Sequence, residues 1–169
     1  MAAARKAPRR PSRKKPAAHR RYTVDASVFV NAFNPHEDGH VESLAILTAI
    51  QEVGDPVIVP TLVLPEIASG VARASDDNAG ALEYANATAA LPYLMTIALN
   101  SAMARQAAEL AATHRLRGAD ALYVAVARRY ATVLVSRDEE QRSRAAAIIA
   151  CQTPEEALRS RQPPKRTPR

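Results

Sequence analysis

The chain has 169 residues, which suits one domain, and its charge is unevenly distributed. Residues 1–21 carry nine Lys or Arg and residues 159–169 carry five, with no acid in either segment. Because the whole chain has 23 basic and 17 acidic residues, residues 22–158 hold nine basic and all 17 acidic side chains, a net charge of −8. Such an acidic body does not attract nucleic acid diffusely and needs cations or local basic patches to bind it.

The single cysteine, Cys151, excludes an intrachain disulfide and a zinc site built from several cysteines. No apolar run reaches the roughly 18 residues that a membrane span needs, and the N-terminus lacks the apolar segment of a secretory signal. We therefore expect a cytoplasmic protein that does not cross a membrane. The basic, Pro-rich residues 1–21 and the basic residues 159–169 are predicted to be disordered arms. Two interpretations of the arms stay open, as contacts to nucleic acid or as solvated tails.

Short apolar runs alternate with helical patterns throughout residues 22–158, which predicts an α/β fold with a mostly parallel sheet of four to five strands and helices on both faces. Strands are expected at Tyr22–Val24, Val57–Val59, Leu94–Leu99 and Thr132–Val135, with a short edge strand at Ile148–Ile149. Helices are expected at Ser27–Phe33, Val41–Val53, Leu62–Ala72, Ala79–Ala90, 101–114, Ala121–Tyr130 and from Asp138 to about Ala147, followed by a last helical turn from Thr153.

Four acidic residues stand where strands end or helices begin. Asp25 and Asp138 follow apolar strands, and Glu66 and Asp120 begin apolar helices. Taken singly, each has a plain explanation as a helix cap or a first-turn acid. Taken together, they belong to the edge where a parallel sheet gathers its site. Four converging carboxylates repel one another, and a hard cation such as Mg²⁺ or Mn²⁺ removes that cost.

Four segments of the chain carry a family resemblance. They are Val24–Phe29 together with Asn31, Val59–Glu66, Arg117–Ala127 and Leu134–Glu139. In this order and spacing they resemble the PIN-domain ribonucleases, and most closely the VapC-like toxins of bacterial toxin–antitoxin pairs. The resemblance extends from about Tyr22 to Leu158, and the long N-terminal arm departs from it.

The resemblance implies a three-layer α/β/α nuclease domain at residues 22–158 that cleaves RNA with Mg²⁺ or Mn²⁺. It also implies a homodimer and a cognate antitoxin. Asp25 and Asp120 would hold the metal directly, with Glu66 and Asp138 acting directly or through water. Supporting polar contacts would come from Ser27, Asn31 and Ser136. Arg115, Arg117 and Arg137, near the proposed rim, are candidates for contacts to RNA phosphates, and a solvated surface is the interpretation that the sequence favours for them.

Two other function classes are considered beside the ribonuclease. One is a non-catalytic nucleic-acid-binding module that uses its basic arms and whose acids are helix caps. The other is a phosphoacceptor of receiver type, which needs a lysine near its acids. Residues 22–158 contain no lysine, which argues against a receiver. No glycine-rich phosphate loop of the GxGxxG or GxxxxGK[ST] type occurs either.

Overall fold

The computed structural model describes residues 20–161, and within them five parallel strands form one sheet. The strand order is β3-β2-β1-β4-β5, and every neighbouring pair is parallel. The strands are β1 (Tyr22–Val24), β2 (Val57–Pro60), β3 (Leu94–Ile97), β4 (Val133–Val135) and β5 (Cys151–Gln152). The α/β fold with a parallel sheet that the sequence predicts is confirmed.

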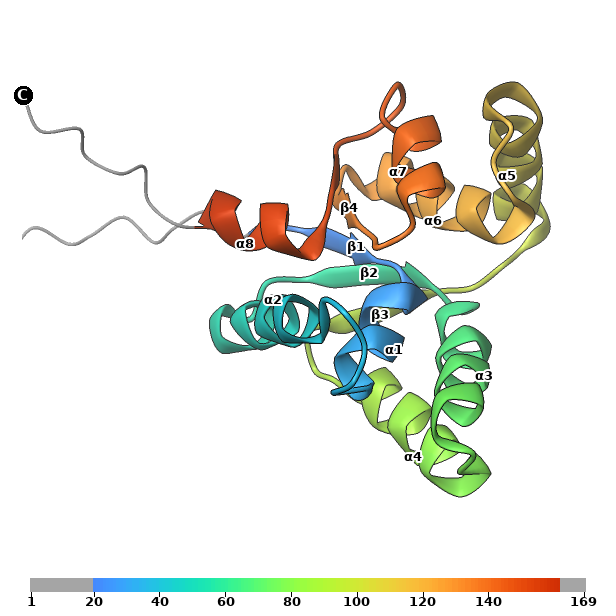
Figure 1. Ribbon diagram of the computed structural model, residues 1–169. Coiled ribbons are helices and arrows are strands. Elements are labelled where there is room, and N and C mark those ends of the chain that lie inside the picture. The colour runs from blue at the N-terminus through green and yellow to red at the C-terminus, as the bar shows by residue number, and fades with distance from the viewer. Residues whose placement is uncertain (1–19, 162–169) are drawn as a thin grey trace, which may run out of the picture.

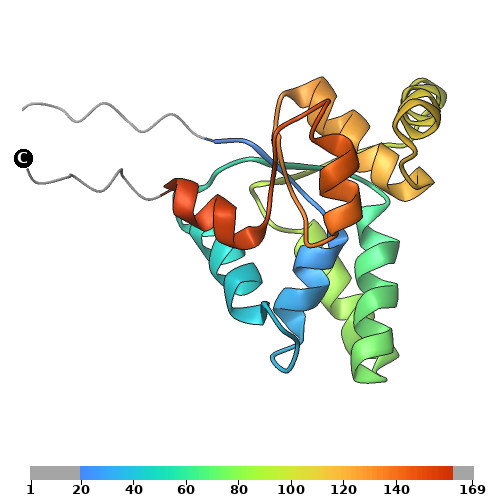
Figure 2. The same cartoon turned by 45° about the horizontal axis from the view of Figure 1, so that its top comes forward.

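Helices cover both faces of the sheet and make three layers (Figure 1). They are α1 (Ala26–Phe33), α2 (His40–Val53), α3 (Val63–Ser75), α4 (Asn78–Ala89), α5 (Ser101–His114), α6 (Gly118–Tyr130), α7 (Glu139–Ala145) and α8 (Pro154–Arg161). On one face α1 lies between α2 and α3, as Figure 2 shows, and α4 packs on α3. On the other face α6 lies against β1, β2 and β4 and packs on α5. The last helix, α8, returns to pack on α2.

The direction in which strands are added reverses at β1. From β1 the chain proceeds outward through β2 to β3, then returns to the other side of β1 with β4 and β5. In open parallel sheets the crevice at such a reversal, outside the carboxyl ends of the strands, is the usual place for a site. Here those ends are followed by Asp25 after β1 and by Ser136 after β4. The topology therefore brings two distant parts of the sequence to one edge.

Helix α6 is the central helix of its layer. Residues 121–127 are all buried, because the helix lies flat on the sheet and is covered by α5 on its other side. Its first turn carries Asp120, whose carboxylate is close enough to Asp25, at the carboxyl ends of the strands, to interact with its charge. Burial of apolar side chains, at about 25 cal/mol per Å² of apolar surface, holds this helix and therefore fixes the position of Asp120.

A close approach of α1 and α3 narrows the other side of the same edge. A Cβ atom built on Gly70 of α3 would lie 2.6 Å from Cγ2 of Val30 in α1, well inside a van der Waals contact. Only glycine therefore allows this helix spacing. Pro65 is accommodated in the first turn of α3, so that Glu66 follows at the end of the helix nearest the sheet.

Several boundaries differ from the sequence predictions. Helix α3 ends at Ser75 and not at Ala72, α6 begins at Gly118 and not at Ala121, and β3 ends at Ile97 and not at Leu99. The edge strand expected at Ile148–Ile149 is wrong, because the backbone N–H groups of both residues donate to the carbonyl of Ala145 and close the end of α7. Helix α7 accordingly ends at Ala145 and not at about Ala147. The edge strand is instead β5, which pairs with β4. Helix α8 continues to Arg161 and includes the first three residues of the expected tail, while residues 1–19 and 162–169 lie outside the described residues.

Arg20 and Arg161, at the two ends of the described chain, lie close together near the amino ends of β1 and β2, on the side of the sheet opposite Asp25. The guanidinium of Arg161 contacts the buried carboxylate of Asp55 at 2.6 Å and also donates to the Tyr22 hydroxyl and the Ala49 carbonyl. The backbone N–H of Arg20 donates to the other carboxylate oxygen of Asp55 at 3.2 Å. Asp55 thus ties both ends of the domain to the start of β2. Within residues 20–161, no helix has the length and apolarity to span a membrane.

Candidate functional site

Asp25 is the buried carboxylate at the centre of the carboxyl edge of the sheet. It follows β1 and caps α1, where its Oδ2 accepts from the Ser27 backbone N–H at 2.9 Å. Its Oδ1 accepts from Nε2 of Gln141 at 3.2 Å. Only 8% of the residue is exposed, and burial raises the pKa of its carboxyl against the opposing effect of these hydrogen bonds.

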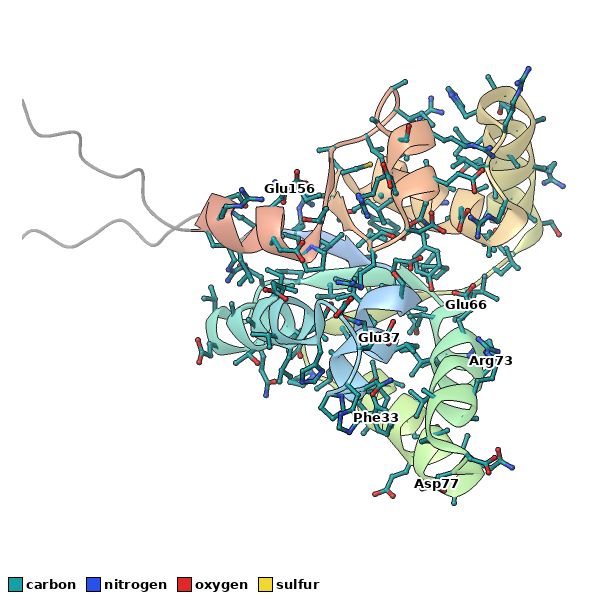
Figure 3. The ribbon with its side chains drawn as sticks, viewed as in Figure 1. Phe33, Glu37, Glu66, Arg73, Asp77 and Glu156 are labelled. Carbon is teal, nitrogen blue, oxygen red and sulfur yellow. The ribbon has the colours of Figure 1, made fainter. Side chains whose placement is uncertain are left out.

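Glu66 lies in the first turn of α3, at the end of that helix nearest the sheet (Figure 3), and lines the same cleft as Asp25. Its Oε2 accepts from the hydroxyl of Tyr123, on α6, at 2.5 Å. Burial raises the pKa of Glu66, and the negative charges of Asp25 and Asp120 raise it further, while the hydrogen bond from Tyr123 lowers it. The carboxylates on α3, on α6 and after β1 therefore repel one another across a short distance.

Asp120, in the first turn of α6, is the third carboxylate. Burial raises its pKa to about 6 from an ordinary value of 3.8. The guanidinium of Arg117 opposes this change, and the charges of Asp25, Asp138 and Glu140 add to it. A carboxyl with such a pKa is destabilised in its charged form and gains from a cation placed near it.

Asp138 stands beside the three and not among them. It caps α7, where its Oδ1 accepts from the Gln141 backbone N–H at 3.0 Å. Its Oδ2 lies 3.1 Å from the guanidinium of Arg117. The charge of Asp138 still acts on both Asp25 and Asp120, so it belongs to the same electrostatic unit.

Asp25, Glu66 and Asp120 line an open cleft of about 550 Å³. Its walls come from the end of β1, from α1 and the loop that follows it, from α3, from the start of α6 and from the loop after β4. The lining residues are Asp25, Ala26, Ser27, Val30, Glu37, Glu66, Ser69, Gly70, Arg73, Arg117, Asp120 and Arg137. Three of the four predicted acids therefore line one cleft, and Asp138 lies outside its lining.

The donor set has the chemistry of a hard-cation site. Hard divalent cations take carboxylate oxygens, and the mutual repulsion of Asp25, Glu66 and Asp120 is the cost that such a cation removes. The guanidinium of Arg117 contacts Asp120 and Asp138 and so places one positive charge beside these acids. Within residues 20–161, however, no three His, Cys, Asp or Glu side chains are arranged so that they would hold a metal ion as they stand. The residues fit the ion in charge and donor type.

The predicted supporting residues hold the backbone around the acids. The Ser27 Oγ accepts from the Arg137 backbone N–H at 3.2 Å, which joins α1 to the loop after β4. The buried Ser136 Oγ accepts from the Asp138 backbone N–H at 3.0 Å. Asn31 is directed elsewhere, because its amide donates to the Asp38 carbonyl at 3.0 Å and fastens the loop after α1.

The three predicted RNA-contacting arginines are placed differently from one another. Arg117 lines the cleft and is paired with acids. Arg137 also lines the cleft, but its guanidinium donates to the carbonyls of Asp38, at 2.7 Å, and Gly39. Arg115 caps the end of α5 in a left-handed conformation and lies outside the cleft lining.

Three residues of the site were missed from the sequence. Tyr123 and Gln141 donate to Glu66 and Asp25 from inside the protein. Each stands three residues after a predicted acid, which places it on the same side of its helix as that acid but does not identify the distant acid to which it donates. Arg73 lines the cleft from the outer part of α3, where Figure 3 shows it farther from the sheet than Glu66. Nothing in its sequence context distinguishes it from a surface arginine.

Comparison with known proteins identifies the family of this domain. The family model described as PIN domain matches residues 22–147. The chain belongs to the PIN-domain family. No match was found among curated proteins.

Solved structures share the fold of this PIN domain at low sequence identity. VapC20 of Mycobacterium tuberculosis, described as a sarcin-ricin loop cleaving toxin, is 18% identical with a TM-score of 0.64, over 76% of this chain and 96% of that one. A chain of VapBC2 from Rickettsia felis, solved with a DNA fragment from its promoter, is 17% identical with a TM-score of 0.59, over 79% and 98%. A chain of FitAcB from Neisseria gonorrhoeae is 20% identical with a TM-score of 0.54, over 79% and 98%. At these identities the likeness concerns the fold alone.

Proposed function

We propose that this PIN domain is a metal-dependent endoribonuclease. The observation that carries the proposal is the meeting of Asp25, Glu66 and Asp120, from three separate elements, in one open cleft where each has a raised pKa. Acidic residues that only cap helices have no reason to share a cleft. Carboxyl groups with shifted pKa values that lie together in a cleft are typical of functional sites. In this proposal Asp25, Glu66 and Asp120 hold Mg²⁺ or Mn²⁺. Asp138, which is paired with Arg117, adds to the negative charge around the ion.

The protein side chains position the acids and the substrate. When bound, the divalent cation would supply positive charge to the scissile phosphate and make a water molecule more acidic. Gln141 donates a hydrogen bond to one carboxylate oxygen of Asp25, and Tyr123 donates one to Glu66. These hydrogen bonds limit the orientations of the two carboxylates. Addition of water to phosphorus with loss of the 3′ oxygen leaves a 5′-phosphate and a 3′-hydroxyl, and no covalent nucleophile is required.

Arginines at the outer wall of the cleft are proposed to contact the RNA backbone. Arg73 is exposed, and within residues 20–161 it forms no ion pair with an acid, so its guanidinium is available to a phosphate. Arg137 is partly committed to loop carbonyls and has N–H groups left over. Basic side chains beside an acidic centre suit a polyanion that is cleaved at a cation.

The biological setting is proposed from the fold neighbours. VapC20 is described as a toxin, and the VapBC2 structure is described as bound to promoter DNA. By analogy, we propose that this chain is the toxin of a toxin–antitoxin pair. In this setting it would form a homodimer, be inhibited by a cognate antitoxin and act in the cytoplasm on cellular RNA.

Cleavage of defined RNAs tests the proposed activity. The purified protein is expected to cut single-stranded and stem-loop RNAs with Mg²⁺ or Mn²⁺ and to be inactive with EDTA. Asp25→Asn and Asp120→Asn should abolish cleavage, since loss of a ligand costs several kcal/mol of barrier. Asp76→Asn is the matched control, because Asp76 is an exposed acid at the end of α3, where asparagine also suits the left-handed backbone. Cleavage by Asp120→Asn at the parent rate would refute the site assignment.

The basic arms support a second candidate, a non-catalytic nucleic-acid-binding module. Deleting residues 1–19 separates the two functions. A nuclease should keep its Mg²⁺-dependent cleavage and show a shallower salt dependence of RNA binding, whereas a binding module should lose its affinity.

A further inference from the structure

Arg117 is a positive charge that the chain itself places on the acids of the site. It precedes α6, and its side chain forms no cap hydrogen bond to that helix. One terminal nitrogen lies 3.1 Å from Oδ2 of Asp138 and 2.7 Å from Oε2 of Glu140, and its Nε lies 3.7 Å from Oδ2 of Asp120. The guanidinium therefore bridges the first turn of α6 to the start of α7.

Several features make this contact easy to exchange. The Arg117 side chain is 58% exposed, and ion pairs open to solvent are weak. Its departure would not leave Glu140 alone, because Arg144 also pairs with that carboxylate. The backbone of Arg117 is an ordinary extended conformation before the helix, so the side chain can turn without distortion of α6.

A divalent cation and the Arg117 guanidinium are both attracted to the carboxylate of Asp120. Two positive groups on Asp120 would repel each other, and a guanidinium does not lose its proton to relieve this. A cation held by Asp25, Glu66 and Asp120 therefore favours release of Arg117. The released side chain already lines the cleft, where a planar guanidinium is suited to bind a phosphate group through two hydrogen bonds.

We propose that Arg117 exchanges between these carboxylates and an RNA phosphate. In the metal-free protein it pairs with Asp120, Asp138 and Glu140, and after the cation binds it contacts the RNA phosphate. This inference rests on the proposed function and gives Arg117 opposite effects on two ligands: it weakens cation binding and strengthens RNA binding. An arginine that serves only the fold, or only the general charge of the surface, would not produce this pattern.

The first measurement is the affinity for Mn²⁺ without RNA, from the electron paramagnetic resonance signal of the free ion. Arg117→Gln should bind Mn²⁺ about tenfold more tightly than the parent, because a repelling and competing charge is gone. Arg117→Lys keeps the charge and should remain close to the parent. Arg128→Gln makes the same charge change at an exposed position on α6 outside the cleft lining, and should leave the Mn²⁺ affinity unaltered.

The second measurement is the affinity for a fluorescent oligouridylate by anisotropy, in EDTA and in saturating Ca²⁺. Arg117→Gln should weaken RNA binding by about tenfold in Ca²⁺, with a salt dependence smaller by about one ion, and should change it little in EDTA. A loss that is equal in both conditions, or a Mn²⁺ affinity that does not increase, would overturn the exchange.

The parent protein separates failure of this inference from failure of the proposed function. If the parent binds Mn²⁺ and Asp120→Asn abolishes binding, a negative result with Arg117→Gln overturns the exchange alone. If the parent binds no Mn²⁺, both the exchange and the metal-dependent activity are refuted.

Discussion

Replacement of Asp120 by asparagine should stabilise the metal-free protein while it abolishes cleavage. The carboxyl has a pKa of about 6 in the folded protein and an ordinary value of 3.8, mainly because of burial. Because the folded value is the higher one, the folded protein binds more protons between about pH 4 and 6, and its stability falls as pH rises through that window. Above pH 6 the cost is fully present, and asparagine removes it.

The size of the gain follows from the same values. At about 1.4 kcal/mol per pKa unit, the difference corresponds to about 3 kcal/mol. The cleft is open to solvent, which lessens both the desolvation of the carboxylate and its repulsion by the other acids, and we expect a net gain of about 1–2 kcal/mol at pH 7.5. The ion pair with Arg117, at 3.7 Å and largely exposed on the arginine side, subtracts little. For a domain of this size the gain corresponds to an increase in Tm of about 3–6 °C.

Thermal unfolding in EDTA at pH 7.5 and pH 4.5 measures this effect. The increase in Tm should be present in full at pH 7.5 and about half as large or less at pH 4.5, where Asp120 of the folded parent is mostly protonated but the unfolded chain is still largely ionised. Asp76→Asn, at an exposed position, is the control and should change Tm by less than about 1 °C at either pH. A decrease in Tm at pH 7.5, or an equal increase at both values, would show that Asp120 is not held in an unfavourable charged state.

Three other substitutions test separate contacts. Tyr123→Phe removes only the hydroxyl that donates to Glu66; Mn²⁺ affinity, measured by titration, should fall about tenfold, and unchanged affinity would exclude a positioning role. Gly70→Ala places a methyl group where α1 and α3 are closest, and urea unfolding should show a loss of about 1–3 kcal/mol; a gain, as expected for an exposed helical glycine, would mean that the helices separate freely. Asp55→Asn leaves the Arg161 guanidinium without its carboxylate and should cost about 2–3 kcal/mol in the same assay, with RNA cleavage per folded molecule unaltered; a change in cleavage would connect the two edges of the sheet.

The parts of the site set by short stretches of sequence could be predicted. An apolar run that ends in an acid places Asp25 after β1, and the same pattern places Ser136 and Asp138 after β4. A proline in a first turn places Glu66 at the start of α3. The alternation of strands and helices then determines which edge of the sheet these positions share. Convergence of three acids was therefore accessible from local signals and topology.

The parts that depend on long-range side-chain packing could not be predicted. Gln141 donates to Asp25 across 116 positions of sequence, and Tyr123 donates to Glu66 across 57. A polar side chain of a helix can contact the site or another part of the core. Which of these it does depends on residues that are distant in the sequence but adjacent in the folded protein. The misplaced edge strand has a similar cause: Ile148 and Ile149 are apolar, but their backbone groups complete the end of a helix. Hydrophobicity alone does not distinguish these uses.

The junction at Asp55 has a practical consequence for engineering this domain. Because Arg20 and Arg161 are both fastened to one carboxylate, at the edge of the sheet away from the cleft, a short glycine–serine bridge could join these positions. Circular permutants with new ends at the exposed Asp76–Asp77 bend between α3 and α4 should then retain an open cleft. Affinity tags or fluorescent proteins attached directly before Arg20 or after Arg161 would likewise lie away from the acids.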